Sequence, residues 1–87
     1  MKKITITVVF NQWGHGYINI IPSDYNEWDP TSSSSKDYNL DPGDYSFIYS
    51  TVTGGGGTIS ITDSAGTVLA SSPVATGMDQ GNFRLTI

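Results

Sequence analysis

The chain has 87 residues, no cysteine, four Lys and Arg against eight Asp and Glu, and a formal net charge of -4 at pH 7. Negative charge is the wrong sign for a phosphate backbone, so we expect no nucleic-acid partner, and the missing thiols exclude disulfides and a thiolate zinc site. With 37% hydrophobic and 14% charged residues, the composition is neither that of a disordered chain nor that of a membrane-spanning one. We therefore expect one domain, residues 1–87, with no membrane insertion.

The first ten residues alternate between apolar and other side chains, which is the period of a half-buried strand. One face of this segment carries Ile4, Ile6, Val8 and Phe10. Two lysines before an apolar run are a feature of signal peptides, but threonines interrupt this run and no small-residue cleavage site follows it. We predict a strand here and no signal peptide.

Residues 16–21 predict a second strand, which Pro22 ends. The stretch "NQWGHG" before it, residues 11–16, is predicted to be a hairpin connection with two glycines free to take positive φ. Residues 22–35 hold two prolines and a serine run, so they predict the longest loop of the chain. A long loop in a small domain is where binding residues are expected.

Residues 36–40 and 44–52 predict the third and fourth strands, joined by Asp-Pro-Gly-Asp. Pro42 favours the first central position of a turn and Gly43 tolerates positive φ at the second, so we predict a type II turn. The stripe that follows, Tyr45, Phe47 and Tyr49, is expected to face the core because Phe47 has no polar group to hold it in water. This turn requires no ligand, and we interpret it as a folding device.

Residues 58–62, 67–72 and 82–87 predict the last three strands, with the glycine run 54–57 as a flexible connection and 73–81 as a loop. No window shows helical spacing of apolar residues. Short alternating strands separated by frequent turn signals predict an all-β fold, a single antiparallel β-sandwich of about seven strands. Its predicted core consists of Ile4, Ile6, Val8, Phe10, Ile18, Ile20, Leu40, Phe47, Ile59, Ile61, Leu69, Phe83 and Leu85.

The turn and strand "LDPGDYSF" resemble the L-x-P-G-x-Y-x-apolar motif of prealbumin-like modules, such as carboxypeptidase regulatory-like domains and collagen-adhesin B-type repeats. The tail is similar to their D-x-x-G-x-x-L and G-x-F-x-L rhythm through Asp63, Gly66, Leu69, Gly81, Phe83 and Leu85. Immunoglobulin and fibronectin type III domains carry a related tyrosine turn. The resemblance implies a non-catalytic sandwich, immunoglobulin-like or prealbumin-like, that serves as a spacer, stalk or binding module. From collagen adhesins it also implies an isopeptide bond, here between Lys3 and Asn82.

Catalytic chemistry has few candidate residues in this chain. His15 is the only histidine and lies between two glycines of a predicted loop, where neither a nucleophile nor a packed base is expected. Glu27 is the only glutamate, and the other acidic residues fall on predicted loops rather than on a cleft. The stretch "TGGGGT" lacks the lysine and the helix of a P-loop. We expect no enzyme and no catalytic residue.

Carboxylates and amides on the predicted loops offer the hard oxygen ligands that calcium prefers. They belong to Asp24, Asn26, Glu27 and Asp29 in the long loop and to Asp37, Asp41 and Asp44 around the turn. No EF-hand spacing or calcium repeat is present, and the same residues can simply cap turns and keep the surface acidic. We predict no cofactor and no metal site, with calcium as the open alternative.

Large aromatic residues crowd the predicted hairpin and the long loop. They can anchor a protein partner, stack on a glycan or plug one end of the core. The predicted binding residues are Trp13, Tyr17, Tyr25 and Trp28 as anchors, with Asp24, Glu27 and Asp29 as a charged rim. Exposed edge strands offer a second route, pairing with a neighbouring copy.

The predicted function is a non-catalytic structural or protein-binding β-sandwich module, such as a spacer, a virion or surface structural protein, or an adhesion module. One alternative is a carbohydrate-binding module that uses the same aromatic residues, and another is a small acidic phage-type inhibitor. Low charge and many Ser, Thr and Asn residues favour an extracellular or virion surface. If Met1 is native, the absence of a signal peptide favours cytoplasmic synthesis, so localisation stays open.

Overall fold

The computed structural model describes residues 1–22 and 27–87, and these residues form β-strands and no helix. The strands are β1 (Lys2–Phe10), β2 (Trp13–Ile21), β3 (Ser34–Leu40), β4 (Asp44–Gly54), β5 (Gly57–Asp63), β6 (Val68–Val74) and β7 (Gly77–Thr86). The all-β prediction is confirmed. The described part of the chain holds no helix long and apolar enough to cross a membrane.

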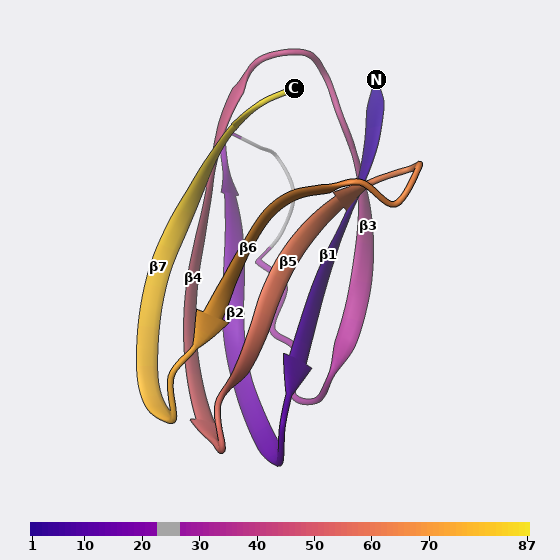
Figure 1. Ribbon diagram of the computed structural model, residues 1–87. Helices are drawn as coiled ribbons and strands as arrows, with labels where there is room; N and C mark the ends of the chain where they lie inside the picture. Colours follow the sequence, from indigo (N-terminus) through magenta and orange to yellow (C-terminus); the bar gives the residue numbers. More distant parts are fainter. Residues whose placement is uncertain (23–26) are drawn as a thin grey trace.

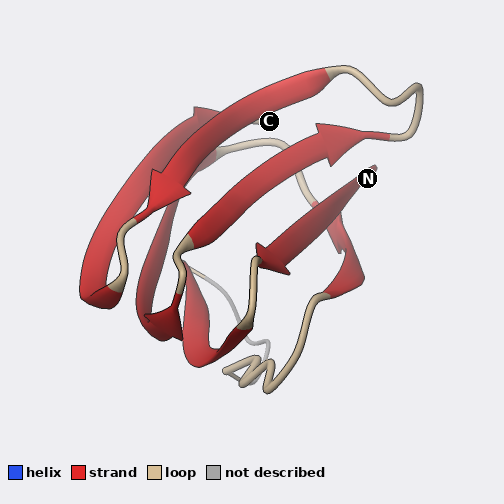
Figure 2. Ribbon diagram, turned by 60° about the horizontal axis from the view of Figure 1, so that its bottom comes forward, coloured by secondary structure: helices blue, strands red, loops and turns tan. Residues whose placement is uncertain are grey.

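The strands form two antiparallel sheets. Sheet A has the order β3-β1-β5-β6, and sheet B has the order β2-β4-β7. Figure 1 shows β7, β4 and β2 on the left and the strands of sheet A to their right, and Figure 2 shows the two layers. Only β5 and β6 are consecutive strands of one sheet, so every other connection carries the chain across to the opposite layer.

Both sheets contribute to one cluster of buried side chains, because alternate residues of each strand point between the layers. Ile4, Ile6 and Ile61 are 0% exposed. The predicted core is confirmed, with Leu69, Phe83 and Leu85 partly buried at its margin. Tyr38 and Val74 also belong to it, although the sequence analysis did not include them.

The motif Asp41–Asp44 is a crossing between the sheets and not a type II turn. Gly43 has a φ of 158°, far from the roughly +80° of that turn, and it exchanges backbone hydrogen bonds of 3.1 and 2.8 Å with Ile87. The Tyr45 hydroxyl donates a hydrogen bond of 2.8 Å to the carbonyl of Asp41. The predicted turn type is wrong. The hydrogen bond from Tyr45 to Asp41 nevertheless gives the motif a structural role, because it fixes the crossing to the start of β4.

Two predicted connections are partly strand. β2 begins at Trp13, so only Asn11 and Gln12 separate it from β1, and the two strands lie in different sheets rather than in a hairpin. Gly14 serves close packing here, since a Cβ on it would lie 2.5 Å from atoms of the Phe10 ring. Likewise, β7 begins at Gly77, inside the predicted loop 73–81.

The glycine run 54–57 is not simply a flexible connection. Gly54 ends β4 and Gly57 begins β5, so the crossing itself is only Gly55 and Gly56. A Cβ on Gly57 would collide with the Val9 carbonyl of the neighbouring strand. The run is therefore fixed by close contacts with residues that lie far away in the sequence.

Candidate binding site

The outer face of sheet B carries several large side chains that are exposed to solvent. They are Trp13, Tyr17, Ile21, Ile48 and Met78, with exposed fractions of 56%, 39%, 50%, 36% and 83%. We call these five residues the apolar face. β2, β4 and β7 each contribute at least one of them, so the apolar face extends across the whole sheet.

The strand register explains how these side chains come together. Residues 13, 17 and 21 share the outward side of β2 because side chains alternate along a strand. Ile48 lies between Asn19 and Asn82 in the adjacent strands, and Met78 lies opposite Val52. Polar side chains therefore lie between the apolar ones on this face.

A short segment, residues 27–30, lies along the free edge of β2. Trp28 and Ile18 exchange backbone hydrogen bonds of 2.9 and 3.1 Å, and the Gly16 N–H donates one of 3.1 Å to the Pro30 carbonyl. This pairing places Trp28 on the same side as Ile18, half-buried and packed against the core. Glu27 and Asp29, on either side of it, remain exposed.

Glu27 and Asp29 form what we call the acidic rim. A hydrogen bond with Asp29 raises the pKa of Glu27, while a hydrogen bond of 3.2 Å donated by the Asn19 amide acts in the opposite direction. Two adjacent carboxylates hold a proton more tightly than an isolated one does. Across the sheet, on β7, Arg84 is exposed in register with Ser46. The outer face of sheet B thus has two carboxylates at the β2 edge and the Arg84 guanidinium on β7, with exposed Asp44 on the adjacent β4.

A hollow of about 640 Å³ lies between the start of β2 and the segment that leads into β3. Its lining residues are Phe10, Gln12, Trp13, Gly14, His15, Thr31, Ser32 and Ser33. We call it the polar groove. Trp13 stands where the groove meets the apolar face, so it belongs to both.

The predicted anchors and rim have different positions. Trp13 and Tyr17 lie on the apolar face, and Glu27 and Asp29 lie beside it. Trp28 points toward the core, while predicted residues Asp24 and Tyr25 lie outside the described residues.

Sequence reasoning missed Ile21, Ile48 and Met78. The alternation of β2 and β4 could have found the first two, because each occupies an outward position of its strand. Met78 gave no such signal, because it fell within a predicted loop.

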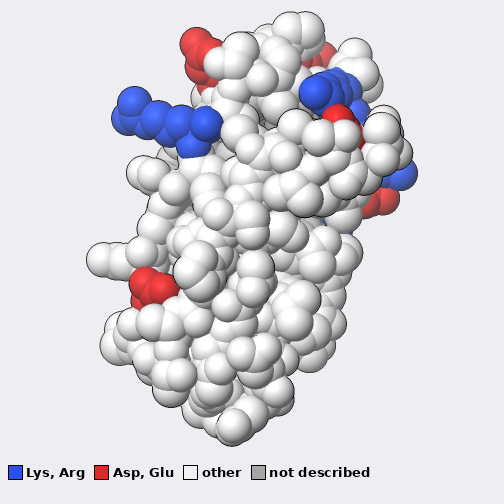
Figure 3. All heavy atoms as spheres, viewed as in Figure 1, with Lys and Arg blue, Asp and Glu red and all other residues white. Residues whose placement is uncertain are grey.

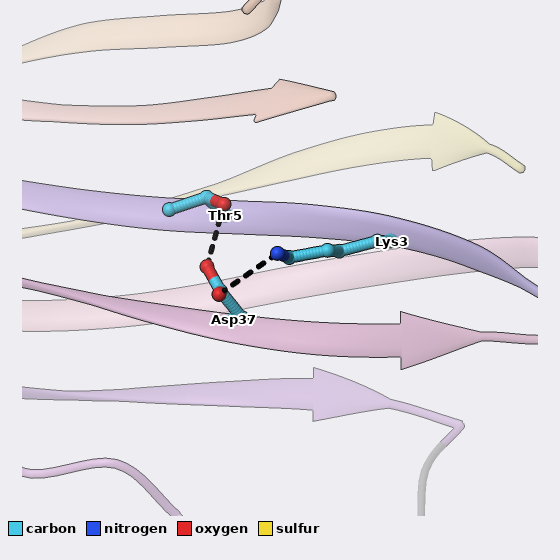
Figure 4. Close-up of polar contacts among 3 residues, drawn as sticks. All are labelled: Lys3, Thr5 and Asp37. Carbon is cyan, nitrogen blue, oxygen red and sulfur yellow. Dashed lines mark hydrogen bonds and ion pairs between the residues drawn. The ribbon is translucent and has the colours of Figure 1, made fainter. Parts of the chain in front are cut away.

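The outer face of sheet A is built differently. Thr5 Oγ1 donates a hydrogen bond of 2.7 Å to Asp37, and Lys3 Nζ lies 3.3 Å from the other carboxylate oxygen (Figure 4). The bond from Thr5, and then that from Lys3, lower the pKa of Asp37. Lys3 lies on this face and Asn82 on the outer face of sheet B, so the isopeptide bond that the resemblance implied cannot form.

The described residues hold no group of three or more His, Cys, Asp or Glu side chains that could bind a metal ion. Asp37 is tied to Thr5 and Lys3, while Asp44 accepts a hydrogen bond of 2.7 Å from Thr86, so these two predicted calcium ligands serve different contacts. Asp24 and Asn26 lie outside the described residues. The prediction of no metal site, with calcium as the alternative, is therefore not tested by these contacts. His15 is exposed on β2, opposite Val52.

No family model, no curated protein and no solved structure matches this chain. The resemblance to prealbumin-like modules therefore rests on the Tyr45 turn and the motif of the tail alone.

Proposed function

We propose that this chain is a non-catalytic structural module that binds protein, and that it docks the apolar face onto a second copy of itself. The observation that carries the proposal is the set of exposed aromatic and aliphatic side chains across sheet B. Each Å² of apolar surface removed from water contributes about 25 cal/mol. Covering these five side chains, which lie among polar ones, would remove apolar surface from water.

Charge favours a second copy as the partner. A twofold axis along β4 lays β2 of one copy over β7 of the other, which brings the Arg84 side chain toward the acidic rim of the partner copy. A twofold axis across the strands lays β2 on β2 instead and sets the two acidic rims against each other, at a cost in free energy. The arrangement of charges therefore selects the first of these two packings.

The proposal includes an immunoglobulin-like or prealbumin-like β-sandwich. The division into four and three strands and the tyrosine tie at Asp41 support it, because immunoglobulin constant-type domains have both features. The interior position of β1 in sheet A is a departure, because the first strand of those domains lies at an edge. A spacer, adhesion or virion-surface role would use the same docking surface.

Concentration-dependent sedimentation tests the self-association. We expect a dimer with a Kd below about 1 mM, and Tyr17→Ser should weaken it about tenfold, since about 1.4 kcal/mol of apolar contact would be lost. The matched control is Thr7→Ser on the outer face of sheet A, which should leave the Kd unchanged. A chain that stays monomeric at about 1 mM, or a dimer indifferent to Tyr17→Ser, would contradict the proposal.

The proposal also holds that the chain has no catalytic activity. It rests on the exposure of His15 and on the absence of a nucleophilic cysteine from the sequence. A screen of ester, peptide and glycoside substrates should show no turnover. Turnover that disappears in His15→Ala would contradict this part of the proposal.

A further inference from the structure

We infer that the polar groove binds an uncharged sugar unit of a glycan, with the Trp13 indole as its stacking surface. This site adjoins the proposed self-association surface and shares Trp13 with it, while its other lining residues lie outside the apolar face. The groove volume of about 640 Å³ lies within the range of roughly 300–1,000 Å³ that small-molecule sites occupy.

The charge of the groove selects the class of ligand. None of its lining residues is Asp, Glu, Lys or Arg. Figure 3 shows most charged side chains toward the upper part of the molecule, one acidic side chain at the left below the middle, and none at the lowest end in that view. A phosphate, a sulfated sugar or a peptide rich in charge would find no counter-charge among these side chains. A neutral polyhydroxyl compound needs only uncharged donors and acceptors.

Close contacts with glycine hold two of the lining side chains in place. Trp13 lies opposite Gly54 in the register, and a Cβ on Gly54 would approach the indole Cε2 to 2.6 Å. Gln12 lies over Gly55 in the same way, with its Cγ 3.0 Å from a Cβ built there. Both side chains therefore rest directly on the backbone, and binding would cost little of the entropy that free side chains lose.

The indole remains available for stacking although it rests on the sheet, since 56% of Trp13 is exposed. Aromatic side chains with one covered and one open face bury apolar area at low entropic cost. The C–H face of a pyranose ring offers a flat apolar surface that matches the indole. This contact would supply most of the affinity.

Polar side chains around the indole would orient the bound sugar through hydrogen bonds. Gln12, His15, Thr31 and Ser32 bring amide, imidazole and hydroxyl groups to the lining, and each type both donates and accepts hydrogen bonds. The Ser33 hydroxyl already accepts a hydrogen bond of 2.8 Å from the Phe10 N–H, so it fixes the wall of the groove. An apolar wall with a few placed polar groups is the usual composition of a ligand site.

Tryptophan fluorescence gives a direct test, because the chain has two tryptophans. In a Trp28→Phe variant, Trp13 is the sole fluorophore, and phenylalanine keeps an aromatic ring against the core. This variant is titrated with neutral cello-, xylo-, malto- and chito-oligosaccharides and, as charged probes, with oligogalacturonate and heparin fragments. We expect one neutral series to shift the Trp13 emission and to protect it from iodide, and the charged probes to have no effect.

Variants then assign the binding to the groove. In the native background, calorimetry should show binding lost by at least tenfold in Trp13→Ala and weakened about three- to tenfold in Gln12→Ala. Gly54→Ala should also weaken binding, although Trp13 is still present, because the methyl group displaces the indole. Thr7→Ser on the outer face of sheet A should bind as the native chain does. Far-ultraviolet spectra verify that each variant is folded.

Two results would overturn the inference: no neutral oligosaccharide protects Trp13, or binding is equal in the native chain, Trp13→Ala and Gln12→Ala. If Gly54→Ala unfolds, the exposed Gln12→Ala decides, and unchanged affinity in that variant counts against the groove. Sedimentation and sugar titration of the native chain separate the two proposals. A native chain that binds sugar and stays monomeric supports the groove and contradicts self-association, and a native dimer that binds no sugar does the reverse.

Discussion

In both sheets every second side chain points outward, but the outward side chains of the two sheets differ in chemical type. On sheet A, outward side chains of β1 bond to those of β3, as Thr5 does to Asp37 and as Thr7 does to Ser35 at 2.9 Å. On sheet B, Tyr17 and Ile48 present ring and aliphatic carbon to solvent. On sheet A these polar groups pair with one another, although Val9 and Val68 are exposed there at 46% and 59%. Sheet B exposes five large apolar side chains, which is why we propose it as the face that a partner covers.

Carboxylates repeat this contrast. Asp37 on sheet A lies between a hydroxyl and an ammonium group, and its pKa is lowered. Glu27 beside sheet B has another carboxylate as its neighbour, and its pKa is raised. A carboxylate without a cationic partner among the described residues, such as Glu27, is available to a cation on another molecule.

The largest expected effect comes from placing one lysine on each face. Ile48→Lys on β4 should weaken self-association by about 100-fold or more, because an uncompensated charge buried at an interface costs at least about 3 kcal/mol. Thr58→Lys, on the exposed side of β5, adds the same charge and should leave the Kd within about twofold. Analytical ultracentrifugation compares the two. Equal losses in both variants would mean that net charge, and not the apolar face, controls association.

A second pair of variants tests how hydrogen bonding of two buried hydroxyl groups on the inner side of sheet B affects stability. Thr51 and Thr53 are 3% and 2% exposed on the inner side of β4. The Thr51 hydroxyl has no hydrogen-bond partner among the described residues, whereas Thr53 donates to the Ala75 carbonyl and accepts from the Gly56 N–H, each at 3.1 Å. The two hydroxyls thus differ in pairing and not in burial.

Replacing each of these threonines with valine should change stability in opposite directions. Thr51→Val removes an unpaired buried hydroxyl and should raise the free energy of unfolding by about 1 kcal/mol. Thr53→Val leaves the Gly56 N–H without its partner and should lower it by about 2 kcal/mol. Urea denaturation measures both. If Thr51→Val is the more destabilising variant, the assignment of its hydroxyl as unpaired is wrong.

Much of the fold could be predicted because alternation records local burial. The sequence of β1 shows one apolar face, and the buried residues Ile4, Ile6 and Val8 lie on it. Alternation does not show which sheet a strand joins or which strands it pairs with. Residues 11–16 look like a hairpin connection, yet β2 pairs with β4 and not with β1. Only packing between distant segments decides that the chain crosses to the other sheet.

The candidate site was predictable in part for the same reason. Both Trp13 and Tyr17 were predicted as binding residues and both are exposed, but Trp13 was expected in the connection 11–16 and lies on β2 instead. The inward direction of Trp28 depends on its backbone pairing with Ile18, and the role of Gly54 depends on Trp13. Neither pairing leaves a trace in the local sequence, so these contacts appeared only with the tertiary structure.

The hydrogen bond between Tyr45 on β4 and Asp41 in the crossing from β3 should have a smaller effect on stability. Tyr45→Phe removes the hydrogen bond to the Asp41 carbonyl and keeps the ring, so we expect the free energy of unfolding to fall by about 1 kcal/mol. Self-association should not change, because Tyr45 is not part of the apolar face. Thermal unfolding and sedimentation measure the two quantities. A weaker dimer in this variant would show that the crossing and the outer face are coupled.

The smallest expected effects are the titrations of the two carboxylates, which should respond in opposite directions. Asp37, with its pKa lowered from 3.8, contributes stability that is present above 3.8 and lost as pH falls through the lowered pKa. Glu27, with its pKa raised from 4.5, contributes stability that is present below 4.5 and lost as pH rises through the raised pKa. The two faces therefore impose opposite slopes on stability in this acidic range.

Carboxyl NMR titrations of variants measure these shifts without any need for unfolding. Thr5→Val removes the strongest cause of the Asp37 shift, so that pKa should rise toward 3.8 while Glu27 stays the same. Asp29→Asn removes the neighbouring carboxylate, so the Glu27 pKa should fall while Asp37 stays the same. Each variant is the control of the other. If the Glu27 pKa does not move in Asp29→Asn, the two carboxylates of the acidic rim do not interact. The charge argument for a second copy would then rest on Arg84 and a single carboxylate.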